Sequence, residues 1–401
     1  MRAARRTLEP AGPWWWAVLA AGAALRVFLA VATGGTDDVR IWQSHAGWTW
    51  EYGLVGYYER SPVFNHPPFA AWLMQGVWML ARATGWPFGA LERALFAALD
   101  LGNTLLLLSL LRGERHRALV AACYWLHPLA FVFSAYHGNT DTAVAFSMLL
   151  AVWAAVRGSA VGAGAALGAG LWIKVPVLLA APAIAFALPD ARQRLRFAAA
   201  LGAVGLSTYL PALLAAPDLV VSRVFGYAGR RISTPGGTAI WGVWGVLGAP
   251  DALPEWLAPL SRAHLAANAA VCGLPVLLLA WLRQGERSPR GLGTTVCASL
   301  CIVFGFTHSP WAFQYAAWIA PFLFLPGWRF ALLATLALGG YVYAVYAWLT
   351  GHPLLLGDWD FGATPEWPAL LVAWRDAAVA FCFASAWGFL GAAAWRRWIR
   401  A

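Results

Sequence analysis

Charged residues are scarce in this chain: 11% of its 401 residues are Asp, Glu, Lys or Arg, whereas 61% are hydrophobic. A soluble domain carries about 25% charged residues, so the composition excludes an ordinary water-soluble protein. Lysine is almost absent, and Lys174 is its single occurrence. Cysteines are few and follow no metal-binding or pairing pattern, so we expect small buried side chains and no disulfide framework. They are Cys123, Cys272, Cys297, Cys301 and Cys382.

In place of charge, the chain has repeated apolar stretches of roughly 17–25 residues, the length that crosses a bilayer as a helix. Its arginines, which give a net charge of +10, stand in short clusters between these stretches. We interpret them as signals of membrane orientation and not as a nucleic-acid surface. The sequence therefore predicts an all-α, polytopic membrane protein with a single domain over residues 1–401 and no nucleic-acid partner.

Placing every arginine cluster on the inner side predicts about twelve spans with both termini in the cytoplasm. High Ala, Gly, Trp and Arg with one lysine is typical of a GC-rich bacterial genome, so we expect the plasma (inner) membrane. Loops 34–87 and 217–261 then face outward. Segment 66–85 is expected to be an interfacial or re-entrant helix, because a crossing there would reverse every later loop. The predicted spans are 14–33, 88–111, 117–135, 141–157, 159–173, 176–189, 195–216, 262–282, 291–307, 311–327, 329–350 and 369–395.

The first outer loop contains most of the polar residues near the beginning of the chain. Asp37 and Asp38 are adjacent, just after the first predicted span. Trp42 and His45 follow one turn apart on an expected amphipathic helix, and His66 stands in "HPPF". We expect these side chains to lie together at the outer rim of the membrane.

Two further features are predicted to reach the same rim. In "HGNTD", Asn139 or Thr140 can cap the next helix with Asp141 in its first turn, but a cap alone does not explain His137. Lys174 separates two apolar stretches that are each short for a ~30 Å hydrocarbon core. A charge at such a break is a functional candidate, with a snorkelling interfacial lysine as the alternative.

Cations and polar groups on this face would suit a phosphate at the level of the lipid headgroups. Arg223, Arg230 and Arg231 fall in the loop 217–261, which is predicted to face outward. They have two explanations: they bind anionic groups of a substrate, or they bind lipid headgroups. Carboxylates beside such cations fit the transfer of a group from a lipid-linked phosphate donor to a hydroxyl: a carboxylate takes the proton and cations stabilise the departing phosphate. The additional donor-binding candidates are Arg223, Arg230, Arg231, His308, Gln314 and Tyr315.

These motifs resemble those of the GT-C superfamily, the multi-spanning glycosyltransferases that use polyprenyl- or dolichyl-phosphate sugars. The similarity covers most of residues 14–330 and consists of "TDDVRIW", "HPPF", "GNTD", "KVPV" and "FQYAAW" followed by "IAPF". Several of them resemble the mannosyltransferases of glycosylphosphatidylinositol assembly and their prokaryotic relatives. "HPPF" and its following helix also resemble the lipid-linked-oligosaccharide glucosyltransferases.

The resemblance implies an inverting transfer of a hexose from a polyprenyl-phosphate sugar to a lipid-linked or cell-envelope glycan acceptor, on the extracytoplasmic face. Mannose is the family-weighted expectation. The base is either Asp38, which matches the family pattern better, or Asp37, because the pair lacks the spaced Asp-x-Asp of some relatives. Asp141 would be a second acidic residue, with Lys174 at the donor phosphate. No cofactor is required, and a divalent ion at the three aspartates is left open.

Two other functional classes are compatible with a polytopic chain. A multi-pass lipid or glycan transporter or flippase is the main alternative, and its usual marks are repeated halves and ionisable residues at the bilayer midplane. A scaffold subunit of a cell-envelope assembly is the third, and it predicts that the outer-face carboxylates are dispensable. Neither repeated halves nor a midplane charge cluster is evident in the sequence.

Overall fold

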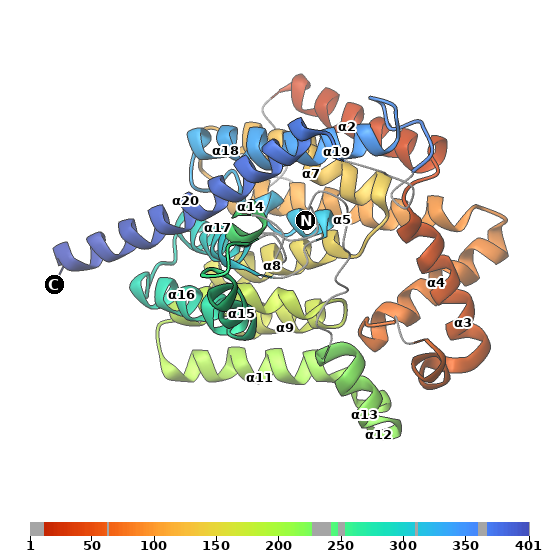
Figure 1. Cartoon of the computed structure of the whole chain (residues 1–401), viewed down its shortest axis with the longest axis horizontal. Helices are drawn as coiled ribbons and strands as arrows, with labels where there is room; N and C mark the ends of the chain where they lie inside the picture. Colours follow the sequence, from red (N-terminus) through yellow and green to blue (C-terminus); the bar gives the residue numbers. More distant parts are fainter. Residues whose placement is uncertain are drawn as a thin grey trace.

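The computed structural model describes residues 12–61, 64–226, 242–247, 253–308, 312–359 and 367–400. These residues form an all-helical protein without a strand, as the composition predicts (Figure 1). The largest core is apolar and combines segments from both halves of the chain, including Trp15, Phe133, Leu300 and Tyr346. The two halves of the chain therefore both contribute to this core.

Within the described residues, five helical segments are long and apolar enough to cross a membrane, which is compatible with a membrane protein. Two bent helix pairs raise the number to at most seven, and the predicted count of about twelve spans is not confirmed. The five are α2 (Pro13–Ala32), α5 (Phe88–Leu110), α17 (Pro289–Phe306), the segment Trp328–Leu349, and α20 (Ala369–Arg400). The fourth consists of α18 (Trp328–Ala334), the π-helix η7 (Thr335–Gly340) and α19 (Tyr341–Leu349).

Several other predicted spans are short or broken. Helix α6 (Arg117–Trp125) bends by 49° into the segment Pro128–His137, and α15 (Ala258–Ala266) bends by 66° into α16 (Asn268–Leu282). Proline at position 128 explains the first break, since it cannot continue a helix hydrogen-bond ladder. The shorter apolar helices are α8 (Asp141–Val156), α9 (Ala160–Leu171), and η2 (Val175–Ala180) with α10 (Ala181–Ala187).

Two predicted spans do not form continuous helices. The segment 195–216 divides into α11 (Ala191–Ser207) and α12 (Leu210–Ala215). Between residues 312 and 327 the chain forms only the short 3₁₀ turns η5 (Phe313–Ala317) and η6 (Ala320–Phe322). Pro321 and Pro326 stand inside or beside this stretch and remove backbone donors that a long helix needs.

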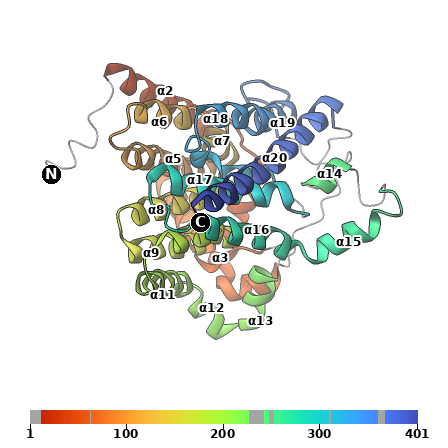
Figure 2. The same cartoon turned by 90° about the vertical axis from the view of Figure 1, so that its left-hand side faces the viewer.

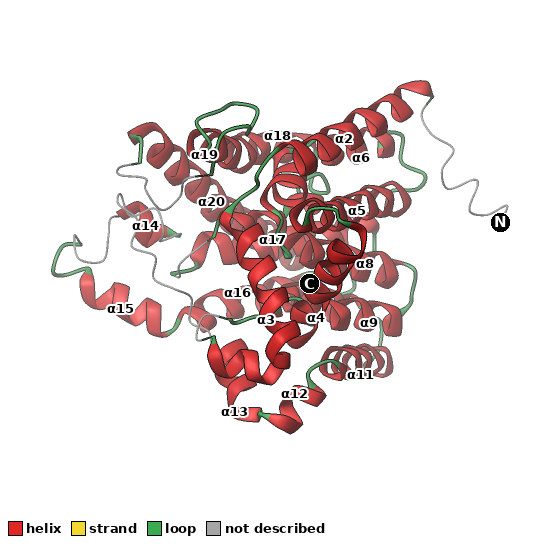
Figure 3. Ribbon diagram, turned by 90° about the vertical axis from the view of Figure 1, so that its right-hand side faces the viewer, coloured by secondary structure: helices red, strands yellow, loops and turns green. Residues whose placement is uncertain are grey.

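Small residues allow helices α9 and α11 to lie unusually close. A Cβ added to Gly164 would approach the Phe197 carbonyl oxygen to 2.2 Å, and one on Gly168 would meet the Gly205 nitrogen at 2.9 Å. Glycine at such contacts lets backbones approach in membrane helices. Figures 2 and 3 show α8, α9 and α11 as successive layers on one side of the molecule.

The first long loop folds into two helices that cover one side of the bundle (Figures 1 and 3). Helix α3 (Asp37–Arg60) kinks at Gly53, and α4 (Pro68–Thr84) begins at a proline and ends at Gly85, whose φ is +74°. They enclose a second apolar core with the region of α12, α13 (Pro217–Val220) and the π-helix η3 (Val221–Phe225). Within the second long loop, α14 (Val243–Leu247) is also described.

Candidate functional site

Helix α3 begins at the acidic pair because Thr36 caps it. The Thr36 hydroxyl accepts the backbone N–H of Asp38 at 3.3 Å and donates to the His137 carbonyl at 3.0 Å. This side chain therefore connects the start of α3 to the segment that carries "HGNTD". Adjacent helical residues point about 100° apart, so the two aspartates have different surroundings.

Asp37 points to the exterior, where it pairs with Arg40, and 44% of its side chain is exposed. Asp38 points to the interior, and its Oδ2 lies 2.8 Å from His137 Nε2. The amide nitrogen of Asn139 donates to the same oxygen. The structure thus distinguishes the two aspartates that the sequence left open, since only Asp38 joins the other predicted site residues.

His137 and Asn139 reach Asp38 through an unusual backbone. The π-helix η1 (Val132–His137) ends at Gly138, whose φ of +71° is in the left-handed region that favours glycine. Helix α8 starts at Asp141, and its first N–H bonds to the Asn139 side-chain oxygen at 3.3 Å. Thr140 stands at the N-cap position without a side-chain capping bond, and the Asn139 side chain also contacts two other residues of the site.

Lys174 lies on the other side of Asn139. Its Nζ is 2.7 Å from Asp141 Oδ2 and 3.5 Å from Asn139 Oδ1. Asp141 is fully buried, and the Trp318 indole N–H donates to its second oxygen at 2.5 Å. Lys174 keeps 14% of its side chain exposed and lies 5.5 Å above the Tyr315 ring. Asp141 is consequently enclosed by its partners.

These contacts form one chain of polar groups, which we call the Asp38–Lys174 network. It consists of residues from α3, the η1–α8 junction, the α9–η2 junction and the segment after η5: Asp38, His137, Asn139, Asp141, Lys174 and Trp318. Residues up to 280 positions apart in sequence meet there because four elements end or break at this place.

The electrostatics of the network keep Asp38 ionised. Burial is the largest effect and would raise its pKa, but the charge and hydrogen bond of His137 act in the opposite direction. The Asn139 amide and the Lys174 charge add to this, and together they lower the pKa of Asp38 from 3.8 to about 2. With 30% of its side chain exposed, Asp38 is the carboxylate of the network that a ligand can reach.

Aromatic and imidazole rings stand beside Asp38. The Trp42 and His66 rings are 4.4 Å apart between centroids, and His45 bonds through Nδ1 to the Tyr57 hydroxyl. Burial lowers the pKa of His45 to about 4, although the Asp38 charge acts to raise it. Burial also lowers the pKa of His66 well below its usual value. These histidines are neutral at pH 7 and form an uncharged wall.

Among the remaining predicted residues, His308 has described contacts with residues outside the network. His308 bonds through Nε2 to Ser261 Oγ at 2.8 Å and stacks on Trp244, in a cluster with His264. Its predicted place at the donor sugar or phosphate stays a prediction. Gln314 is half-buried in η5, and Arg223 is half-buried in η3. Arg230 and Arg231 lie outside the described residues.

Three site neighbours were not predicted. Tyr346 contacts His137 Nδ1 through its hydroxyl, and Trp318 holds Asp141. Glu92 is fully buried, neither of its carboxyl oxygens has a hydrogen-bond partner, and a Cβ on Gly138 would lie 3.4 Å from its Oε2. The charged pair Glu92–Arg93 inside an apolar span was the available signal, because intramembrane charges mark functional regions.

The described residues contain no group of three or more His, Cys, Asp or Glu side chains arranged to hold a metal ion. Asp37 pairs with Arg40, and Asp141 is enclosed by Lys174 and Trp318, so the three aspartates do not form one cation site. No protein-family model matches the chain, and a search of curated proteins finds no match.

Proposed function

We propose that the chain is an integral membrane glycosyltransferase that moves a hexose, mannose being the first candidate, from a polyprenyl-phosphate donor to a hydroxyl of a lipid-linked or cell-envelope glycan. The observation that supports this most is the place of Asn139. Its amide nitrogen contacts the carboxylate of Asp38, and its amide oxygen contacts the ammonium of Lys174. An anion suited to a hydroxyl and a cation suited to a phosphate thus stand on either side of one amide.

In this proposal Asp38 orients the acceptor hydroxyl. A carboxylate with a pKa of about 2 is a weak base in the empty site, so it accepts a hydrogen bond first. Proton transfer follows as the acceptor oxygen bonds to the anomeric carbon and the hydroxyl becomes acidic. The bond from that carbon to the phosphate oxygen breaks at the same time, its electron pair leaves with the phosphate, and the configuration inverts.

Lys174 receives the departing phosphate. An ammonium carries three donors, and Asp141 and Asn139 occupy two of them. The third can point to a phosphate oxygen. Asp141 therefore acts by holding Lys174 in place, which differs from the role of a second catalytic carboxylate that the resemblance implied. The predicted extracytoplasmic orientation and plasma-membrane location are part of this proposal.

The test compares Asp38→Asn with Asp37→Asn, a matched control one residue away. Lipids that accumulate in cells lacking the protein, identified by mass spectrometry, supply the acceptor, and purified protein in liposomes is given polyprenyl-phosphate mannose and then other polyprenyl-phosphate sugars. Loss of a general base costs about 10²–10⁴-fold, so we expect that loss for Asp38→Asn and a nearly unchanged rate for Asp37→Asn.

A wild-type rate in Asp38→Asn would refute the mechanism. Counterflow of a labelled lipid across the liposome membrane, with no new glycosidic bond, would instead support a transporter. Labelling of single cysteines at positions 37 and 40 with a membrane-impermeant reagent tests the predicted side of the membrane.

A further inference from the structure

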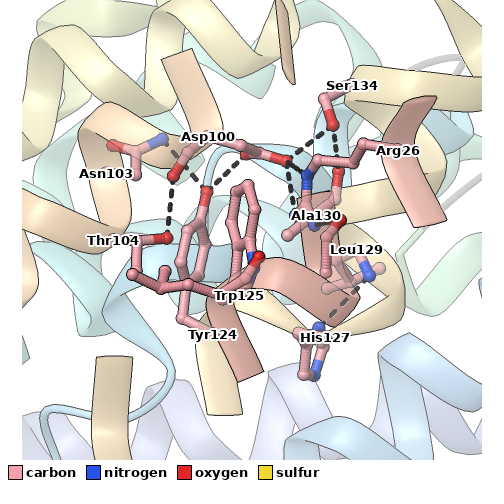
Figure 4. Close-up of polar contacts among 12 residues, drawn as sticks. Arg26, Asp100, Asn103, Thr104, Tyr124, Trp125, His127, Leu129, Ala130 and Ser134 are labelled. Atoms are coloured by element: carbon pink, nitrogen blue, oxygen red, sulfur yellow. Dashed lines mark hydrogen bonds and ion pairs between the residues drawn. The ribbon is translucent and has the colours of Figure 1, made fainter. Parts of the chain in front are cut away.

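A second polar cluster lies inside the apolar helices, next to the segment that carries His137. Arg26 on α2 and Asp100 on α5 are 2% and 1% exposed, and the guanidinium reaches Asp100 Oδ2 through Nε at 3.3 Å and Nη2 at 3.0 Å. The guanidinium also lies 3.6 Å over the Trp125 ring. Figure 4 shows this pair at the centre of the cluster.

Asp100 is bonded from three different helices. The Tyr124 hydroxyl on α6 donates to its Oδ1 at 2.6 Å, and the Ser134 hydroxyl on η1 lies 2.6 Å from its Oδ2 (Figure 4). The Ser134 hydroxyl has one hydrogen and a second acceptor, the Ala130 carbonyl at 2.9 Å. The shorter contact to a charged oxygen is the stronger one, so Ser134 bonds mainly to Asp100.

Ser134 and His137 are three residues apart on the same π-helix. A π-helix is rare and occurs mostly as a single turn within α-helices, frequently at functional sites. Asp100 holds one side of η1 through its bond with Ser134. The last residue of η1, His137, contacts Asp38, and Asn139, two residues later, donates to the same carboxylate. A rotation of η1 would therefore move both donors of Asp38 together.

We propose that Arg26, Asp100 and Ser134 are positioning residues that set the rotation of η1 and so direct His137 and Asn139 to Asp38. This inference deepens the proposed function and rests on it for its kinetic consequence. None of the three touches Asp38, and each acts through η1.

The alternative is that the cluster only stabilises the fold. The energetics of buried ion pairs distinguish this alternative from a positioning role. Removing one partner leaves an uncompensated charge, but replacing both with apolar residues of similar volume is often neutral for stability. The double variant Arg26→Met/Asp100→Leu should therefore fold while η1 loses its support. Ser134→Ala removes only the last contact. Thr104→Ala is the control, because Thr104 bonds to the Asp100 backbone carbonyl and not to its carboxylate (Figure 4).

The first measurement does not depend on catalysis. Histidine labelled with ¹³C at Cε1 gives one resonance per residue in detergent micelles, and the loss of a signal in His137→Gln assigns His137. We expect that resonance to move or to split in Arg26→Met/Asp100→Leu and in Ser134→Ala, and to stay in place in Thr104→Ala.

The second measurement is transfer from polyprenyl-phosphate mannose in liposomes. Misplacement by about 1 Å costs on the order of 100-fold, so kcat should fall about 10–100-fold in the double variant, with little change in KM. A folded double variant with the His137 resonance and kcat of the wild type would overturn the proposal. If the wild type shows no transfer but the His137 resonance moves as expected, the positioning role stands and the proposed function fails.

Discussion

Replacing Lys174 with methionine tests how the network is held together. The substitution keeps the length of the side chain and removes the ammonium, which leaves Asp141 fully buried with the Trp318 N–H as its described donor. Breaking a buried pair in this way costs about 3–5 kcal/mol, because a charge is left without its partner. The double variant Asp141→Asn/Lys174→Met removes both charges, so we expect it to recover about 2–3 kcal/mol of that loss.

The assay is reversible unfolding in mixed micelles, followed by tryptophan fluorescence, for the four proteins of this double-mutant cycle. Arg40→Met is the control, since it removes the cation of an exposed pair with Asp37 and should leave stability unchanged. Under the proposed function, both variants that lack the ammonium lose transfer, although the double variant should be about 2–3 kcal/mol more stable than Lys174→Met.

Two results would refute this reasoning. A single Lys174→Met variant as stable as the wild type would show that Asp141 does not depend on the ammonium. A double variant no more stable than the single one would show that the loss came from packing around the lysine side chain and not from the buried charge.

Three further predictions concern titration and protonation. The pKa of Asp38 is about 2 in the folded state and about 3.9 in an unfolded chain, so its contribution to stability is complete above about pH 5. The difference in stability between the wild type and Asp38→Asn should shrink as the pH falls from about 5 toward 2. The pKa of His45 is about 4 in the folded state and 6.5 in the unfolded chain, so the free energy of unfolding should fall by up to about 3 kcal/mol as the pH falls from 6.5 to 4. The variant His45→Gln should not show this part of the pH dependence. Glu92 is buried and neither of its carboxyl oxygens has a described hydrogen-bond partner. Glu92→Gln keeps the shape of the side chain without its proton equilibrium and removes no described bond, so it should keep both the melting temperature and transfer; a loss equal to that of Asp38→Asn would contradict this.

Composition predicted the helical class well because the rule is simple: a chain with few charges buries its backbone polar groups in helices. The positions of the prolines predicted a separate helix over 66–85 in the first outer loop, and in the structure Pro67 precedes α4, Pro68 begins it and Gly85 ends it. The number of spans was not predictable in the same way. Breaks such as the 49° bend at Pro128 and the 3₁₀ turns of 313–322 depend on tertiary contacts that replace lost backbone bonds.

The sequence brought Asp38, Asn139, Asp141 and Lys174 together on one face by topology alone, and in the structure they share direct contacts. It could not assign their roles, because these depend on burial and partners and not on residue type. The role of His308 stays a prediction, because its described side-chain bond is to Ser261 and a bond of this kind does not reveal what a ligand would contact.

The three aspartates of the acidic motifs illustrate why a carboxylate alone does not indicate a base. Asp37 is exposed and paired with Arg40, so solvent screens its charge and it has no fixed orientation toward the network. Asp141 has fixed orientation but no access, because it is fully buried between two donors. Asp38 alone combines both properties: His137 and Asn139 fix its orientation, and 30% of its side chain is exposed. Fixed orientation with access is what a residue needs in order to align a hydroxyl for attack, so the proposed chemistry depends on Asp38.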